Sequence, residues 1–331
     1  MNKAIAIILA AMLLLAAAAC DNNTAPSSEA SSRTSSAPAS STASEPPAPE
    51  SSQTESGNAV GVLAGVNQEN YPQIDGSTAN MPLLAEMYSK ICGVSYETAE
   101  SMVRVSGGTG AVWQNMMYHG TGLILAYEAP EVIKAGLKQE GVWDNLEITP
   151  VGSDGLVFLV NKQNPVDGLT TQQLIDIYTG KITNWSEVGG NDEPIAAFQR
   201  NIESGSQTLF LRLLMGDITP MDPETELRPY GMGALIDAVA EYDGSGGAIG
   251  FSVYYYANLM NENPNLKLLA IDGIEPTAES IADKRYPLVN DFYVVIRKDE
   301  PQDSPARLVH DWILSDEGKQ LMTDANYVPV K

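Results

Sequence analysis

The chain has 331 residues, of which 44% are hydrophobic, and its formal net charge is −23. This length exceeds what one compact core usually holds and suffices for two lobes. The strongly negative charge argues against a nucleic-acid-binding role, because such proteins need a basic face.

The first residues have the features of an export signal. Lys3 precedes an apolar run from Ala4 to Ala19, which is shorter than the roughly 20 residues that a membrane span needs. The run ends in Ala17-Ala18-Ala19-Cys20, which resembles the lipobox of bacterial lipoproteins, with Ala17 where Leu is usual. We expect residues 1–19 to be a signal peptide and Cys20 to become the lipidated N-terminus. An ordinary secretory signal with a chance cysteine is the alternative.

The segment 21–57 is predicted to be a disordered tether. It contains no Leu, Ile, Val, Met or aromatic residue, so it cannot bury enough apolar surface to offset the entropy lost on ordering. Residues 20–57 would therefore hold the folded part, residues 58–331, at a membrane surface. Lipidation of Cys20 leaves Cys92 without a partner, which predicts a buried thiol and no intramolecular disulfide.

Strand-like and helical segments alternate along the folded part, which indicates an α/β fold with largely parallel sheets. Apolar runs predict strands, and apolar residues at helical spacing predict helices. The expected strands include 123–127, 156–160 and 293–296, and the expected helices are 170–178, 209–215, 234–242 and one terminal helix at 307–322.

The segment 196–210 has the features of an anion site. A short apolar strand runs to Arg200, and Ser204-Gly205-Ser206 then opens an amphipathic helix. Ser204 is the predicted N-cap, and the first amides of the helix have no intrahelical acceptor. Hydroxyls, free amides and a planar guanidinium together suit an oxyanion. The ordinary alternative is a capped helix whose arginine pairs with a surface carboxylate.

Two further loops offer similar donors. Ile74-Asp75-Gly76-Ser77-Thr78 leads from a strand end into a helix, and the small-residue loop 105–110 enters another. Each loop alone is an ordinary cap or turn. Three such loops converging on one point could bind a small oxyanion without bulk positive charge.

These motifs resemble the phosphate-binding protein of bacterial phosphate-specific ABC transporters, over nearly the whole stretch from Tyr71 to Lys331. The resemblance implies a two-lobe type II periplasmic-binding fold with the ligand cleft between the lobes. It divides the chain into a first lobe of about 59–160 plus 268–331 and a second lobe of about 161–267. The segments that carry the resemblance are Asp75-Gly76-Ser77-Thr78, Asp154 to Asn161, Asn164-Pro165-Val166, Leu169 to Trp185, and Arg200 with Ser204-Gly205-Ser206.

The resemblance also implies which residues contact phosphate. Glu128 falls where the family usually has an aspartate that accepts a hydrogen bond from protonated phosphate. Ser106 is the alternative to Thr109 as the donor of the second loop. The implied phosphate-binding residues are Ser77, Thr78, Thr109, Glu128, Arg200, Ser204, Gly205 and Ser206.

The function implied is that of a non-enzymatic, lipid-anchored receptor outside the cytoplasm. It would be a monomer that binds inorganic phosphate and delivers it to a membrane ABC permease with its ATPase subunits, without a cofactor, a metal or nucleic acid. The alternatives are a receptor for sulfate or molybdate, a surface adhesin or signalling lipoprotein that kept the fold, and a phosphoesterase. A carboxylate at Glu128 would favour phosphate, because sulfate has no proton to donate at neutral pH.

Overall fold

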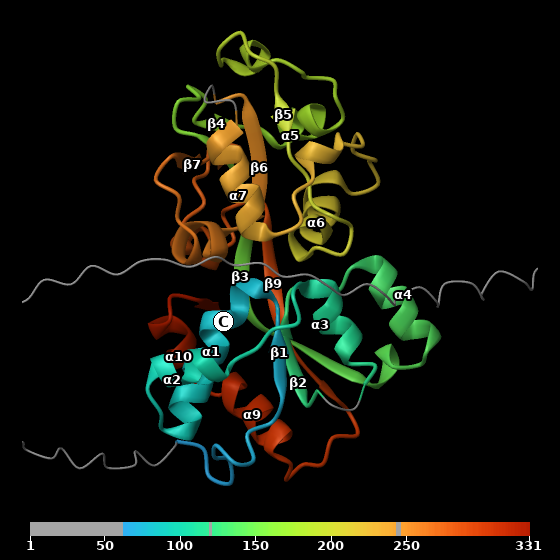
Figure 1. Cartoon of the computed structure of the whole chain (residues 1–331), viewed down its shortest axis with the longest axis vertical. Helices are drawn as coiled ribbons and strands as arrows, with labels where there is room; N and C mark the ends of the chain where they lie inside the picture. The colour runs from blue at the N-terminus through green and yellow to red at the C-terminus, as the bar shows by residue number, and fades with distance from the viewer. Residues whose placement is uncertain (1–61, 119–120, 243–245) are drawn as a thin grey trace, which may run out of the picture. The chain divides into compact units, whose positions relative to one another are not determined.

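The computed structural model describes residues 62–118, 121–242 and 246–331. The predicted signal peptide, Cys20 and the tether lie outside these residues. Within the described part, strands and helices alternate as the sequence predicts (Figure 1). No helix of the described residues is long and apolar enough to cross a membrane.

One mixed sheet runs through this domain, in the strand order β1-β2-β9-β3-β6-β5, with β10 and β7 each pairing with β3. Strands β4 and β8 form a separate parallel pair. The strands are β1 (Ile74–Gly76), β2 (Leu123–Ala126), β3 (Leu146–Asn161), β4 (Gly168–Leu169), β5 (Ala196–Ala197), β6 (Ala248–Val253), β7 (Leu266–Leu268), β8 (Ala270–Ile271), β9 (Val289–Arg297) and β10 (Val328–Pro329).

Strand β3 joins two halves of the sheet. Its first part, through Gly155, pairs with β9, and its second part, from Leu156, pairs with β6 and β7. We name the elements around β1, β2, β9 and β10 the first lobe, and those around β5, β6 and β7 the second lobe. The pairing changes a few residues before the lobe boundary expected at 160, and β8 still pairs with β4 of the second lobe after the boundary expected at 268.

Helices surround both halves of the sheet, with α1–α4, α9 and α10 around the first lobe and α5–α7 around the second (Figure 1). Short 3-10 turns and two π-helical segments complete the structure. The helices are α1 (Met81–Cys92), α2 (Tyr96–Met102), α3 (Thr109–Asn115), α4 (Glu131–Gln139), α5 (Thr171–Tyr178), α6 (Gly205–Leu209), α7 (Met232–Glu241), α8 (Ala278–Ala282), α9 (Pro305–Leu314) and α10 (Asp316–Asp324), and the shorter segments named below are η1 (Thr78–Asn80), η4 (Phe210–Met215) and η7 (Tyr256–Met260).

Two expectations about these elements were wrong. The sheet is not largely parallel, because the long strands β3 and β9 run antiparallel to each other and to their other neighbours. The terminal helix is two helices, because Ser315 adopts an extended conformation (φ −73°, ψ 170°) between α9 and α10. The Ser315 hydroxyl accepts from the Gly318 amide and so caps α10, which makes the break favourable.

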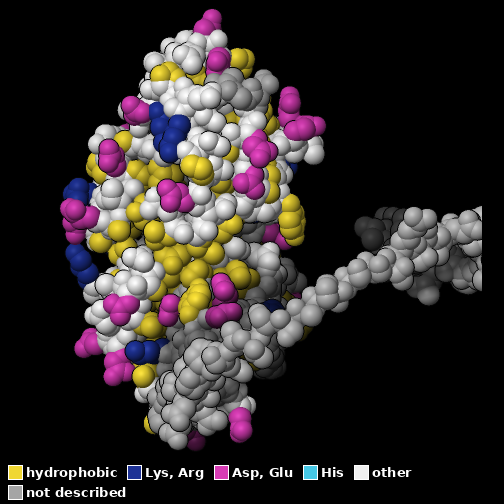
Figure 2. All heavy atoms as spheres, turned by 60° about the vertical axis from the view of Figure 1, so that its left-hand side comes forward, with side chains coloured by type: hydrophobic (Ala, Val, Ile, Leu, Met, Phe, Trp, Pro, Cys, Tyr) yellow, Lys and Arg dark blue, Asp and Glu magenta, His cyan; other side chains and the backbone are white. Residues whose placement is uncertain are grey.

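The core contains the side chains that the apolar runs predict. In the second lobe, Phe210 of η4 stacks on Phe251 of β6 with ring centroids 4.6 Å apart, and Tyr178 of α5 packs edge-on against Phe210. In the first lobe, Cys92 ends α1 as a free, buried cysteine, as predicted. On the face shown in Figure 2, Asp and Glu side chains are spread widely and Lys and Arg are few, in keeping with the net charge.

Candidate functional site

A cavity of about 330 Å³ lies between the two lobes and brings together the three donor loops. Every residue of the first two loops that lines it belongs to the first lobe, and those of the third belong to the second lobe. The lining residues are Ser77, Thr78, Gly107, Gly108, Thr109, Tyr127, Arg200, Ser204, Gly205, Ser206, Tyr230, Gly231, Met232, Gly233, Val253 and Tyr256.

The first-lobe wall is built on hydroxyl groups. Ser77 follows β1 and precedes η1, and its hydroxyl makes no capping bond to that turn. Its Oγ lies 3.0 Å from Oγ1 of Thr109 and accepts a hydrogen bond of 3.2 Å from the Tyr127 main-chain amide. Because this oxygen already accepts from Tyr127, its own proton is available to Thr109 or to a bound anion.

The loop before α3 separates two candidate donors. Asp75 holds this loop, since its carboxylate accepts from the Ser106 amide at 3.0 Å and from the Asn115 side chain at 2.7 Å. The Ser106 hydroxyl accepts from the same Asn115 amide, and Ser106 does not line the cavity. Thr109 does line it, after Gly107 and Gly108 with φ of 84° and 129°. The geometry therefore favours Thr109 over Ser106.

Arg200 is the one Lys or Arg among the described residues that line the cavity. It is only 8% exposed, and burial lowers its pKa to about 10, so the guanidinium is charged at neutral pH. Its Nη2 donates to the Tyr230 carbonyl at 2.7 Å, whereas Nε and Nη1 are buried without a partner. Unpaired buried donors on a charged group are costly, so these two nitrogens indicate a ligand that accepts hydrogen bonds.

The second-lobe wall continues with the start of α6. Ser204 occupies the N-cap position, but its hydroxyl makes no capping bond and lies 3.1 Å from the Ser206 hydroxyl instead. The amides of Gly205 and Ser206 are in the first turn and have no intrahelical acceptor. Ser204, Gly205 and Ser206 line the same cavity as Arg200.

The two walls also touch each other. The Gly110 amide donates to the Glu203 carbonyl at 3.1 Å, which joins the loop of α3 to the loop of α6. A Cβ atom at Gly205 would lie 2.3 Å from Thr109 Oγ1, so glycine permits this approach. The lobes are therefore in contact around the cavity.

The structure does not bring Glu128 to this cavity, which corrects the expectation that it faces the anion. Its carboxylate forms an ion pair with Arg212 of η4, and its side chain is 25% exposed in a separate groove. Glu128 belongs to the first lobe and Arg212 to the second. The ion pair with Arg212 directs the Glu128 carboxylate across the lobe boundary, and Glu128 does not line the cavity. No carboxylate is among the described residues that line the cavity.

Several lining residues were not predicted. Tyr230 and Gly231-Met232-Gly233, which include the N-cap and first residues of α7, line the cavity, and Tyr256 of η7 lies near Arg200. Neither segment carries one of the donor-loop motifs that indicate an anion site in the sequence. The available signals were the glycines at the start of α7 and the run Tyr254–Tyr256, but these are far apart in the sequence, and only the fold brings them to one cavity.

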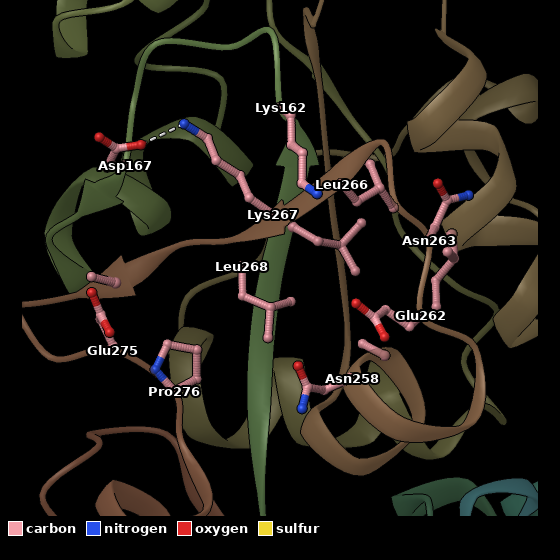
Figure 3. Close-up of a pocket in the computed structure, with 14 residues that line it drawn as sticks. Lys162, Asp167, Asn258, Glu262, Asn263, Leu266, Lys267, Leu268, Glu275 and Pro276 are labelled. Carbon is pink, nitrogen blue, oxygen red and sulfur yellow. Dashed lines mark hydrogen bonds and ion pairs between the residues drawn. The ribbon is translucent and has the colours of Figure 1, made fainter.

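A larger cavity, of about 510 Å³, lies in the second lobe, away from the donor loops (Figure 3). Its side chains include Lys162 and Lys267, but Lys267 is already paired with Asp167 at 2.5 Å, and Glu262 and Glu275 add negative charge. It is therefore a poorer anion site. Within the described residues, no cluster of three or more His, Cys, Asp or Glu side chains could hold a metal ion.

Two lobes joined by long strands, with a donor-lined cavity between them, define the periplasmic-binding class of fold. The family model described as "PBP superfamily domain" matches residues 69–317, and the chain belongs to this superfamily. The family is one of substrate-binding receptors and not of enzymes.

Relatives of known name agree with the resemblance seen in the sequence. The chain is 24% identical to the "Phosphate-binding protein PstS" of Borreliella burgdorferi, covering 80% of this chain and 92% of the relative. It is 27% identical to the protein of the same name from Bacillus subtilis, covering 78% of this chain and 80% of the relative.

A solved structure supports the same conclusion. It is described as a putative phosphate ABC transporter substrate-binding protein with bound phosphate from Clostridium perfringens. It superposes with a TM-score of 0.62 at 28% identity, over 79% of this chain and 100% of that chain. The predicted family and fold are therefore confirmed.

Proposed function

We propose that this protein is an extracytoplasmic receptor that binds inorganic phosphate in the cavity between its lobes and delivers it to an ABC importer. Its mature N-terminus would be a lipidated Cys20 that anchors it to the membrane. The phosphate-binding residues would be Ser77, Thr78, Thr109, Arg200, Ser204, Gly205 and Ser206.

The observation that carries the proposal is the pair of unpartnered nitrogens of Arg200. Nε and Nη1 are buried without a partner, and Arg200 lines the cavity together with serine, threonine and tyrosine residues and the start of α6. A tetrahedral oxyanion would accept from all of these donors at once, and hydrogen bonds to a charged oxygen are stronger than neutral ones. The printed names of the two relatives and of the Clostridium perfringens structure identify phosphate as the anion for those proteins.

A receptor for another tetrahedral oxyanion is the second candidate, and one observation favours it. Because no carboxylate is among the described residues that line the cavity, no charged acceptor there takes a hydrogen bond from protonated phosphate as Glu128 was expected to do. A wall of hydroxyl groups, amides and one guanidinium, without a carboxylate to repel sulfate, would bind sulfate and phosphate with similar contacts. Sulfate and molybdate therefore belong in the first experiment.

The proposal is tested by calorimetric titration of phosphate-stripped protein with phosphate, sulfate and molybdate. Arg200→Ala should weaken phosphate binding tenfold to a hundredfold, because charge-assisted hydrogen bonds contribute on the order of 1.5–3 kcal/mol. Arg285→Ala is a matched control, since Arg285 is an exposed arginine that pairs with Glu279. Equal phosphate affinity in Arg200→Ala and wild type would contradict the assignment of Arg200 to the anion site. Tighter binding of sulfate than of phosphate by the wild type would identify sulfate as the ligand instead.

A further inference from the structure

Asp154 lies at the point where β3 passes from one lobe to the other. Its neighbour Gly155 is the last residue paired with β9, and Leu156 is the first residue paired with β6. Asp154 is 3% exposed and does not line the cavity. Burying a carboxylate costs free energy unless hydrogen bonds compensate, so a buried carboxylate outside the ligand site indicates a specific role for Asp154.

The carboxylate is held by donors that come from both sides of the crossing. Oδ2 accepts from the Tyr127 hydroxyl at 2.6 Å, and Oδ1 accepts from the amides of Gly155 at 2.7 Å and Tyr255 at 3.2 Å. Tyr127 follows β2 of the first lobe, whereas Tyr255 follows β6 of the second. One side chain thus ties three segments together.

No lysine, arginine or histidine of the described residues forms an ion pair with Asp154. The titratable groups around it are tyrosines, namely Tyr127, Tyr254, Tyr255 and Tyr327. Burial raises the pKa of Asp154 to about 6, and the hydrogen bond from Tyr127 opposes that rise. The group is therefore ionised above about pH 6 and neutral below it.

Tyr127 connects this carboxylate to the cavity. Tyr127 is one of the residues that line the cavity, and its main-chain amide donates to the Ser77 hydroxyl, which lies 3.0 Å from the Thr109 hydroxyl. Any movement of Tyr127 therefore moves a wall of the cavity and the orientation of Ser77.

We propose that Asp154 is a positioning residue for anion binding. It holds Tyr127 of the first lobe and Tyr255 of the second lobe in the arrangement that brings the two walls of the cavity together. It acts through Tyr127 and touches no ligand. The inference rests on the proposed function, since it concerns the same cavity.

The decisive variants are Tyr127→Phe, which keeps the ring and removes the donor, and Asp154→Asn, which removes the charge at nearly constant shape. Tyr286→Phe is the matched control, because the buried Tyr286 hydroxyl donates to the neighbouring Leu156 carbonyl at 2.9 Å and lines no part of the cavity. At pH 7.5 we expect both decisive variants to bind phosphate about tenfold more weakly, and Tyr286→Phe to bind within twofold of wild type.

A pH series separates positioning from a merely structural role. The affinity ratio of wild type to Asp154→Asn should shrink between pH 7.5 and pH 5, because wild type becomes neutral at this position as the pH falls. The titration of phosphate itself cancels in that ratio, and the ratio for Tyr286→Phe should stay constant.

The possible outcomes are distinct. Folded Tyr127→Phe with wild-type affinity would overturn the inference, even if Asp154→Asn failed to fold. A ratio for Asp154→Asn that does not change with pH would also overturn it. Wild-type protein that binds no phosphate would reject the proposed function and this inference with it.

Discussion

Gly205 decides how closely the two walls of the cavity can approach. A Cβ atom there would lie 3.1 Å from Cβ of Thr109, a tight contact, and only 2.3 Å from its Oγ1, so the Thr109 hydroxyl could not remain in place. The second lobe can hold α6 against α3 only because this position has no side chain.

We therefore predict that Gly205→Ala weakens phosphate binding by roughly fivefold or more, as overpacking a close contact costs about 1–3 kcal/mol. Calorimetry of the single variant would measure the effect. In a Thr109→Ala background, the same Gly205→Ala change should cost less, because the clashing group is gone. An equal loss of phosphate affinity in both backgrounds would show that the effect of Gly205→Ala does not come from a clash with the Thr109 hydroxyl.

At the residue scale, short motifs predicted many of the polar residues that line the cavity. Ser77, Thr78, Thr109, Arg200 and the loop Ser204-Gly205-Ser206 were predicted from loops that precede helices, and all of them line one cavity. The local donor chemistry was sufficient there.

Glu128 could not be placed in this way. Its direction depends on Arg212, 84 positions later in the chain, and no local pattern reports that ion pair. Tyr230 and Tyr256 were missed for the same reason, since only the folded arrangement brings them beside Arg200.

Among the elements, the segment after β2 and the π-helical segment η4 are joined by an ion pair between the two lobes. Glu128 and Arg212 join them across the lobe boundary, with side chains 25% and 44% exposed. Ion pairs this exposed contribute about 0–1 kcal/mol, so this one should favour closure only modestly.

Glu128→Gln should consequently weaken phosphate binding by less than about fivefold, in line with that contribution. The ratio of phosphate to sulfate affinity should not change, because the side chain does not line the cavity. Competition titrations with both anions would measure this ratio. A marked gain of sulfate binding in the variant would restore Glu128 as the selector of the anion.

Elements with strong local signals were predicted well, and their partners were not. The capping box of Thr170 and Gln173 marks the start of α5, and the apolar runs mark β2 and β9. Strand direction and the break at Ser315 depend on which segments meet in space. A single apolar pattern from 307 to 322 fits one helix or two.

For the whole molecule, the proposal places a folded receptor on a membrane through its N-terminus. Cys20→Ala should block lipidation and move the mature protein out of the membrane fraction, whereas Ser28→Ala in the tether should leave it anchored. Fractionation with mass analysis of the N-terminus would measure both. A Cys20→Ala protein that fractionates like wild type and has the same N-terminal mass would exclude this anchor.

The central claim is that one oxyanion binds between the lobes at Arg200, and a crystal structure of the protein with phosphate tests it most directly. Our account predicts a tetrahedral ligand within hydrogen-bond distance of Arg200 Nε and Nη1, of the Ser206 amide and of the hydroxyls of Ser77 and Thr109. Phosphate bound elsewhere, with those two arginine nitrogens still unpaired, would contradict it.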